Sequence, residues 1–365
     1  MTLAVKSRSA VEDVQIPGSH SDTASAKAKR ARPIAEDMAE DMAEGMPEDT
    51  IEVRVKRVSY EAENINSYEL MAPTGGDLPP FTAGGHIDLH LSNGMIRSYS
   101  LVNDQGERRR YVIAVNKDAA SRGGSRFVHD NIRAGDLITI SHPRNNFTLH
   151  EDAEHSVLIA GGIGITPLLS MARRLEALGR SWELFYAART RVAAAFLDEI
   201  NTIRPNVHSN LHTDFDDERS GRIFDLAGIV NNAPGPAHLY CCGPLPMLEA
   251  FEAAAVKRPI DRVHVEYFQA KAAPALDGGF EVRLARSHRT IAVEPGKTIL
   301  DALLGAGVSA NYACTEGVCG TCETRVLEGV PDHRDQFLSQ EERAANKTIM
   351  ICCSGSRSGT LVLDL

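Results

Sequence analysis

The sequence predicts a multidomain protein with an antiparallel β-barrel, an α/β domain built on a parallel sheet, and a C-terminal α+β domain, in that order. Three observations predict it. Short alternating strands with Gly and Pro turns fill residues 51–147, as in an antiparallel barrel. Strands and helices alternate from Ser156 onward, as in a parallel sheet with helical crossovers. Four spaced cysteines mark the last part of the 365-residue chain, whose length suits two or three domains.

These patterns divide the chain into five segments. Residues 1–49 are expected to be a disordered N-terminal extension, because they hold no aromatic residue and cannot bury enough apolar surface to offset the entropy of ordering. Residues 50–150 form the expected barrel, and residues 151–270 the parallel-sheet domain. Residues 271–279 are rich in Ala, Pro, Lys and Gly and are expected to be a linker. Residues 280–365 form the C-terminal domain.

Apolar periodicity places the individual elements. Barrel strands are expected at 51–56, 86–91 and 111–115, and parallel strands at 157–160, 182–187 and 238–242. Helices are expected at 167–178, 193–203, 245–256 and 298–306, the last of them after two strands that open the C-terminal domain.

Composition excludes several classes of function. Hydrophobic residues make up 43% of the chain and charged residues 24%, which is typical of globular domains. The net charge of -10 argues against a nucleic-acid partner. The sequence contains no run of 18 apolar residues, so neither a membrane span nor a membrane partner is expected. Seven cysteines are too few for a disulfide framework, so we expect a reducing, cytoplasmic location.

The cysteine spacing is the most specific signal. Cys314, Cys319 and Cys322 follow the pattern C-x4-C-x2-C, and Cys352 follows further along, which is the plant-type [2Fe–2S] spacing. A zinc site would favour paired C-x2-C units at both ends. Cys353 adjoins Cys352, and neighbours in an extended segment point to opposite faces. Only one of the two can therefore bind iron, and the spacing selects Cys352.

A glycine-rich turn predicts a nicotinamide dinucleotide site. The strand at 157–160 runs into Gly161-Gly-Ile-Gly-Ile-Thr-Pro167 and then a helix, whose N-terminal N–H groups suit a pyrophosphate. Such a turn alone is weak evidence. It gains weight because segments 186–190, 212–214 and 242–244 end later strands in small or polar residues, where α/β sheets bind ligands. Taken singly, Arg189 is equally an ordinary surface cation, and Cys242 a packed thiol.

A chain with both sites needs a flavin between them, because nicotinamide delivers electrons in pairs and a [2Fe–2S] cluster accepts them singly. The strand Arg97-Ser-Tyr-Ser-Leu101 offers an arginine for phosphate and a tyrosine for a ring, with Arg97 and Tyr99 on one face and Ser98 and Ser100 on the other. Gly123-Gly-Ser125 offers backbone N–H groups and a hydroxyl to a phosphate. A sheet salt bridge and an ordinary turn are the alternatives.

From about residue 50 to residue 365 the chain resembles the phthalate dioxygenase reductase and vanillate O-demethylase reductase family. The resemblance rests on the three motifs above, on the four cysteines, and on Cys242-Gly-Pro-Leu-Pro-Met and Glu266-Tyr-Phe. It implies a flavin-binding barrel, a nicotinamide domain and a C-terminal β-grasp ferredoxin domain. It also implies three cofactors, namely FMN rather than FAD, NADH, and a [2Fe–2S] cluster held by Cys314, Cys319, Cys322 and Cys352.

The resemblance further implies individual site residues. FMN is expected at Arg97, Ser98, Tyr99, Ser100, Ala114, Val115, Asn116, Gly123, Gly124, Ser125 and Phe268. The nicotinamide nucleotide is expected at Gly161, Gly162, Ala188, Arg189, Asp214, Cys242 and Gly243, with Thr166 where nicotinamide and flavin meet. Catalytic roles are expected for Thr166, Cys242 and Glu266.

The implied function is that of an NADH-dependent reductase, the component of a two-component Rieske-type oxygenase that passes electrons from FMN through [2Fe–2S] to a separate oxygenase. The motifs do not choose between ring hydroxylation and O-demethylation. Arg189 and Arg191 leave NADPH open as the donor. Two alternatives stand beside this expectation: a reductase for a P450-type or other oxygenase, and a non-enzymatic iron–sulfur redox sensor.

Overall fold

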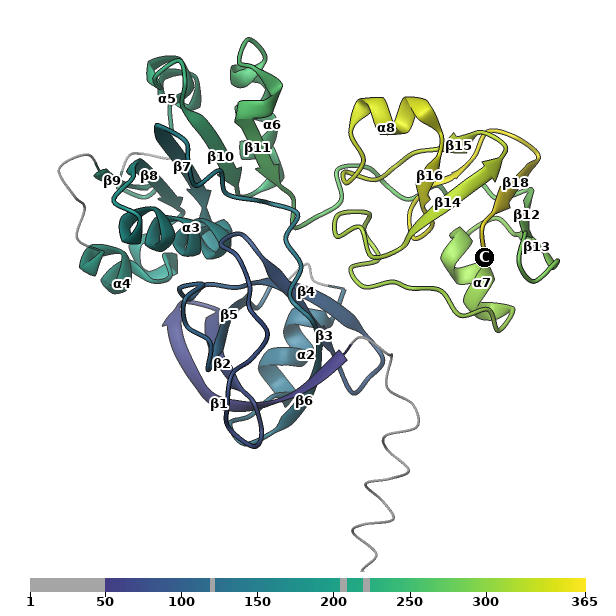
Figure 1. Ribbon diagram of the computed structural model, residues 1–365, viewed down its shortest axis with the longest axis horizontal. Helices are drawn as coiled ribbons and strands as arrows, with labels where there is room; N and C mark the ends of the chain where they lie inside the picture. Colours follow the sequence, from purple (N-terminus) through teal and green to yellow (C-terminus); the bar gives the residue numbers. More distant parts are fainter. Residues whose placement is uncertain (1–49, 119–121, 204–208, 219–223) are drawn as a thin grey trace, which may run out of the picture. The chain divides into compact units, whose positions relative to one another are not determined.

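Three large sheets organise the described part of the chain in the computed structural model (Figure 1). The structure describes residues 50–118, 122–203, 209–218 and 224–365. The disordered extension expected at 1–49 lies outside the described residues.

The first sheet is antiparallel and has the strand order β4-β3-β6-β1-β2-β5. Its strands are β1 (Thr50–Ala62), β2 (Ile65–Met71), β3 (His86–His90), β4 (Ile96–Ser100), β5 (Tyr111–Asn116) and β6 (Leu137–Ser141). A bridge between Leu101 and Ile113 joins the two end strands, and the Val102 N–H donates to the Val112 carbonyl at 2.8 Å. The sheet thus curls into a barrel around a buried apolar core, as predicted.

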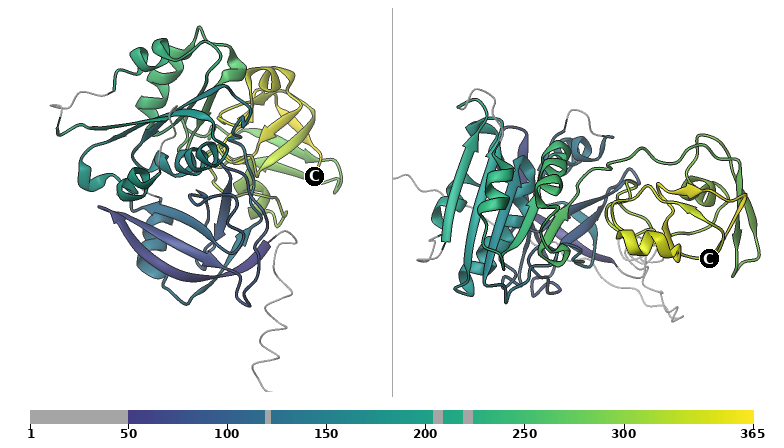
Figure 2. Two further views of the ribbon diagram at one scale, coloured as in Figure 1. Left: turned by 60° about the vertical axis from the view of Figure 1, so that its left-hand side comes forward. Right: turned by 90° about the horizontal axis from the view of Figure 1, so that it is seen from above.

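The second sheet is parallel throughout, with the order β11-β10-β7-β8-β9. Its strands are β7 (His155–Gly161), β8 (Ser181–Ala188), β9 (Ser209–Phe215), β10 (His238–Cys242) and β11 (Val263–Glu266). Figures 1 and 2 show helices on both faces, namely α3 (Ile165–Ala177) and α4 (Leu197–Thr202) on one, and α5 (Leu226–Asn232) and α6 (Leu245–Ala255) on the other. The strand order reverses at β7, and ligands of such sheets bind at this switch point.

One expected helix of this domain begins later than predicted. The pattern indicated a helix at 193–203, but α4 starts only at Leu197. Phe196 lies in the left-handed region at φ 63°, a conformation that a helix cannot contain. Phe196 is buried, so its packing in the core holds this backbone against its local preference.

The third sheet is mixed and belongs to the C-terminal α+β domain. Its order is β13-β12-β18-β14-β16, from strands β12 (Phe280–Leu284), β13 (Thr290–Val293), β14 (Glu323–Glu328), β16 (Thr348–Met350) and β18 (Thr360–Leu363). Between β14 and β18 the chain also forms the small strand pair β15 (Pro331–Asp332) and β17 (Gly355–Ser356) and the helix α8 (Gln340–Ala345). Helix α7 (Ile299–Gly305) starts at a capping box in which Thr298 Oγ1 accepts from the Asp301 N–H at 3.1 Å.

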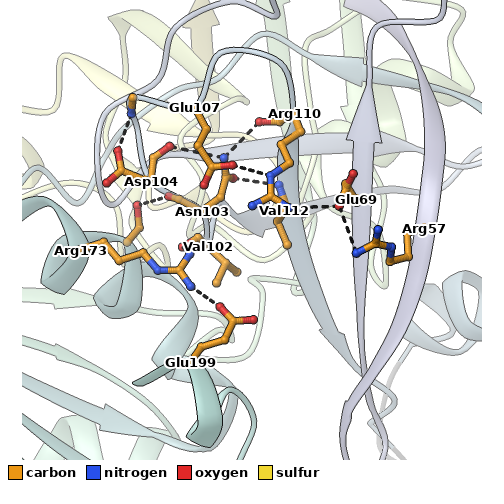
Figure 3. Close-up of polar contacts among 12 residues, drawn as sticks. Arg57, Glu69, Val102, Asn103, Asp104, Glu107, Arg110, Val112, Arg173 and Glu199 are labelled. Carbon is orange, nitrogen blue, oxygen red and sulfur yellow. Dashed lines mark hydrogen bonds and ion pairs between the residues drawn. The ribbon is translucent and has the colours of Figure 1, made fainter. Parts of the chain in front are cut away.

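Hydrogen bonds fasten the barrel to helix α3 of the parallel-sheet domain (Figure 3). The Arg173 guanidinium donates to the Val102 carbonyl at 3.1 Å and pairs with Glu199. The Ser170 hydroxyl donates to the Asn103 carbonyl at 3.0 Å. Asn103 is itself buried, and its Oδ1 accepts from the Val112 N–H at 2.9 Å. The segment after β4 is therefore fixed to the helix that follows the glycine-rich turn.

In the described ranges, no helix combines the length and the apolar character that a membrane crossing requires.

Candidate functional site

A cavity of about 740 Å³ lies where residues of the barrel, the parallel-sheet domain and the C-terminal domain meet. This volume is typical of pockets that hold a cofactor or a comparable ligand. The barrel contributes His86, Arg97, Ser98, Tyr99, Ser100, Ala114, Asn116, Asp118, Arg122, Ser125 and Asn146. The parallel-sheet domain and the segment after it contribute Ile163, Thr166, Val265, Glu266, Tyr267, Phe268, Gln269 and Ala270. The C-terminal domain contributes Cys314, Glu316, Val318, Cys319, Gln336, Phe337 and Glu342.

Most residues that the sequence assigned to FMN line this cavity. All four residues of Arg97–Ser100 line it, although they alternate between the two faces of the strand, because β4 ends the sheet and presents its edge. Val115 instead faces the barrel core, where it is buried. Gly123 and Gly124 are not among the residues that line the cavity.

One end of the cavity is suited to a phosphate. Helix α2 (Gly124–Asn131) begins here, after Gly123 at φ 100°. A Cβ on Gly124 would lie 2.5 Å from Arg97 Nε, so the close approach of these two residues requires glycine. Ser125 Oγ is buried and makes no hydrogen bond to any described residue. A helix N-terminus, an unpaired hydroxyl and the nearby guanidinium group of Arg97 make this end of the cavity suited to an anion.

Glu266 places a carboxyl group in the same cavity. The residue as a whole is half-buried, but its Oε2 is buried and makes no hydrogen bond to any described residue. Burial raises the pKa of Glu266 to about 8, and a hydrogen bond with Ser100 opposes part of that rise. The carboxyl group is therefore neutral at pH 7 and can donate a proton.

The other two residues expected to be catalytic have different surroundings. Thr166 lines the cavity and is buried, and its Oγ1 donates to the Ile163 carbonyl at 3.0 Å. Cys242 pairs with Glu266 in the β10–β11 ladder but is fully buried and does not line the cavity. Burial, with a smaller contribution from Glu266, raises the pKa of the Cys242 thiol well above its ordinary value. The thiol is therefore neutral and packed.

The expected nucleotide residues lie along the carboxyl edge of the parallel sheet. Gly161, Ala188, Asp214 and Cys242 lie at or near the ends of four adjacent strands. The glycine-rich turn packs directly on β10, because a Cβ on Gly164 would lie only 2.2 Å from the Cys242 carbonyl oxygen. This edge lies outside the cavity, and the turn connects the two through Ile163 and Thr166.

Further along that edge, Gly162 follows Gly161 at φ 53°, and Gly243 packs against the Gly161 backbone. Arg189 is exposed, and its carbonyl accepts from the Asp217 N–H at 3.2 Å.

Four buried thiols converge in the C-terminal domain. Cys314 lies within hydrogen-bonding reach of Cys319 and Cys352, and Cys352 also reaches Cys322. Cys353 touches Cys352 but none of the other three among the contacts of the described residues; its Sγ lies 3.8 Å from the Met350 carbonyl oxygen. The four thiols that the spacing selected are thus the ones that face one another, as four ligands of an iron–sulfur cluster must.

The loop that carries three of these cysteines depends on two glycines. Gly317 and Gly320 have φ of 71° and 78°. A Cβ on Gly317 would lie 2.4 Å from Cys353 Sγ, and one on Gly320 would lie 2.4 Å from the Phe337 ring. The tight turn also directs the Glu316 N–H at Cys314 Sγ, at 3.3 Å, as expected for a backbone that stabilises thiolates.

Side chains of the barrel hold this loop, and sequence reasoning did not assign them. Arg122 donates to the Cys314 carbonyl at 3.0 Å and pairs with Glu316 at 2.5 Å. Asn146 donates to the Cys319 carbonyl at 3.0 Å. These bonds join residues that are about half the chain apart, so local spacing carries no signal for them. They hold Cys314 and Cys319 at the wall of the cavity.

A second link runs through Arg144. Its guanidinium donates to Thr321 Oγ1 at 3.0 Å and pairs with Asp88. Asp88 is buried and accepts from the Ser98 hydroxyl at 2.6 Å. Thr321 Oγ1 in turn lies 3.2 Å from Cys319 Sγ. A continuous polar chain thus joins the expected FMN strand to Cys319, an expected cluster ligand.

Comparison with known proteins gives two family matches. Residues 282–355 match the 2Fe-2S iron-sulfur cluster binding domain, and residues 158–253 match the oxidoreductase NAD-binding domain. The chain is 55% identical over 315 residues to the phenoxybenzoate dioxygenase subunit beta of Ectopseudomonas oleovorans, covering 86% of this chain and 97% of that protein. It is 52% identical over 319 residues to the tetrachlorobenzoquinone reductase of Sphingobium chlorophenolicum, covering 87% and 98%.

Two solved structures are also similar. A structure of phthalate dioxygenase reductase, described as modular for electron transfer from pyridine nucleotides to [2Fe–2S], matches with a TM-score of 0.68 and 38% identity, covering 87% of this chain and 98% of that one. An intact type IV self-sufficient cytochrome P450 monooxygenase matches with a TM-score of 0.76 and 36% identity. That match covers 92% of this chain but only 44% of the monooxygenase.

Proposed function

The chain belongs to the phthalate dioxygenase reductase and vanillate O-demethylase reductase family, and on that premise we propose that it is the NADH-dependent reductase component of a two-component Rieske-type oxygenase. It is an oxidoreductase with a nicotinamide domain and a [2Fe–2S] domain. Electrons pass from the pyridine nucleotide through a flavin to the cluster, and from there to a separate oxygenase component.

The observation that carries this proposal is the shared wall of the cavity. Arg97–Ser100 of the barrel, Glu266 of β11 and the cluster cysteines Cys314 and Cys319 all line one space. FMN would fit this space, because the unpaired Ser125 hydroxyl and the α2 N-terminus could hold its phosphate at one end. When bound there, the flavin supplies the conversion from paired to single electrons.

The chain's own residues position the reaction partners. Arg97 and Ser125 would hold the phosphate, while Ser98, Tyr99, Ser100 and Asn116 would border the space for the flavin ring. Thr166 lies where the glycine-rich turn reaches the cavity. Asn146 and Arg122 keep the cluster loop against the same space, which shortens the path for electrons.

Three observations support NADH as the donor. Asp216, Asp217 and Glu218 follow β9, where their charge would repel a 2′-phosphate. The Arg191 guanidinium lies 4.4 Å from the centroid of the Phe215 ring, over its face. It also pairs with Glu218 at 3.1 Å, so its charge is already engaged.

The terminal partner is a separate Rieske-type oxygenase that acts on an aromatic substrate. The name of the phenoxybenzoate dioxygenase relative supports an aromatic substrate. None of the seven cysteines, all of which lie in the described ranges, forms a disulfide, which supports a reducing, cytoplasmic location.

The proposed function is tested by an electron-transfer assay with purified reductase, NADH and purified oxygenases. We expect NADH consumption to couple to substrate oxidation with a Rieske-type aromatic oxygenase and to stop without it. Coupling only to a P450, or rapid reduction of a chlorinated quinone by the reductase alone, would show that the electron acceptor is not a Rieske-type oxygenase. If no acceptor supports NADH oxidation, the reductase function is wrong and a redox sensor is the remaining alternative.

Flavin reduction by NADH is expected to depend on pH through Glu266. Below pH about 8 the Glu266 carboxyl is neutral, and above it a buried negative charge faces the flavin space and disfavours hydride delivery. Stopped-flow rates in the wild type should therefore fall as the pH rises through about 8. Glu266→Gln should abolish this fall of the rate with pH. Ser100→Ala should move it to higher pH, because it removes a hydrogen bond that favours the ionised form. An unchanged fall in Glu266→Gln would assign the titration to another group.

A further inference from the structure

Three histidines from distant parts of the chain lie in contact within the parallel-sheet domain. The ring centroids of His150 and His238 lie 4.5 Å apart, those of His150 and His264 lie 5.0 Å apart, and those of His238 and His264 lie 5.3 Å apart. His238 Nδ1 lies 3.0 Å from His264 Nε2. Their positions in the sequence, 114 residues from first to last, gave no motif.

The sheet brings these side chains together. His238 is the first residue of β10, and Tyr240 lies two residues further on the same face. His264 of β11 is the partner of Tyr240 in the parallel ladder, so its side chain shares that face. His150 comes from the segment between β6 and β7, where its backbone N–H donates to the Tyr240 hydroxyl at 2.9 Å.

We propose that His150, His238 and His264 form a binding site for a divalent transition-metal ion such as Zn²⁺. Each histidine offers one ring nitrogen, and the three nitrogens lie within 4.8 Å of one another. Ligands of a tetrahedral zinc ion at 2.0–2.1 Å stand about 3.4 Å apart. The nitrogens of His238 and His264 are already near that spacing, at 3.0 Å. Rotation of the side chains about χ2 can bring a nitrogen of His150 to a similar distance. The fourth position stays open to water.

The donor chemistry of the three side chains suits a transition-metal ion. Within the described ranges, no ion pair engages any of the three imidazoles. Neutral imidazole is a preferred ligand of zinc, nickel and copper, whereas calcium and magnesium require oxygen ligands.

The site lies at the amino end of β10, opposite the nucleotide edge at Cys242. A bound ion would tie the segment that joins the barrel to the parallel sheet to two of the strands of that sheet. An ion that binds the folded chain more tightly than the unfolded chain raises the unfolding temperature. The site is independent of electron transfer, so it stands or fails separately from the proposed function.

The test is zinc titration of the chelator-treated holoprotein by calorimetry, with cluster and flavin in place. We expect one zinc ion per chain and a higher unfolding temperature in zinc. His150→Ala removes an exposed ligand on a loop, and it should weaken zinc binding about tenfold or more and abolish the thermal shift. His264→Gln, which keeps the side-chain volume, should do the same. His288→Ala is the matched control, because His288 is exposed in the C-terminal domain.

One site in the wild type and in His288→Ala, weakened in both ligand variants, supports the proposal. Equal zinc affinity in the wild type and His150→Ala would place the ion elsewhere, at a thiol for example, and overturn it. The absence of saturable zinc binding to the wild type would overturn it as well.

Discussion

Cys352→Ala is expected to remove the iron–sulfur cluster, whereas Cys353→Ala leaves it in place. Cys352 reaches two other cluster thiols, but Cys353 reaches only Cys352 among the described contacts. Loss of a ligand leaves two irons with three thiolates, so the cluster should not assemble stably. We expect iron and acid-labile sulfide to be lost in Cys352→Ala, and NADH-dependent cytochrome c reduction to be lost with them.

The neighbouring variant is the control. Cys353 is buried to the same degree, so its truncation creates a comparable cavity without removing a ligand. Bleaching of the flavin by NADH should persist in both variants, because hydride delivery does not involve the cluster. Full cluster content in Cys352→Ala, or its loss in Cys353→Ala alone, would show that Cys353 is the fourth ligand.

Ser125→Asp is expected to release the flavin. The Ser125 hydroxyl is buried at the N-terminus of α2, where the phosphate is proposed to bind, so an introduced carboxylate would face a dianion at close range. FMN affinity should fall about 100-fold or more, which corresponds to about 3 kcal/mol. Ser125→Ala removes one hydrogen bond without adding charge and should cost about tenfold.

The measurement is the dissociation constant of FMN from the fluorescence of the released flavin. Ser287→Asp adds the same charge at an exposed position of the C-terminal domain and should leave FMN affinity unchanged. Equal FMN retention in Ser125→Asp and the wild type would remove the α2 N-terminus from the flavin site.

Patterns that depend on nearby residues could be read from the sequence. The cysteine loop is one case, because three ligands lie within nine residues and the geometry of two irons dictates their spacing. The glycine-rich turn is another, because its close packing on β10 excludes a side chain at Gly164. Apolar and polar residues alternate in the barrel strands because one face of each strand packs on the core. β7 is apolar along most of its length because both of its faces are buried.

Features set by tertiary contact could not be read in this way. The bond from Asn146 to the Cys319 carbonyl spans 173 residues, and no local motif marks either end. The left-handed Phe196 follows from burial in the core, not from its own preference. Cys242 was found by its motif, but only the structure shows that its thiol is buried behind the cavity wall.

One chain is proposed to turn paired electrons into single electrons across the cavity between barrel and cluster. The most direct measurement is an anaerobic NADH titration of the holoprotein, followed together by visible absorbance and by the EPR signal of the reduced cluster. The flavin absorbance should bleach and the cluster signal should develop in the same titration, with about 1.5 NADH consumed per chain. Bleaching of the flavin with no reduced-cluster signal, under conditions where dithionite does produce that signal, would contradict it.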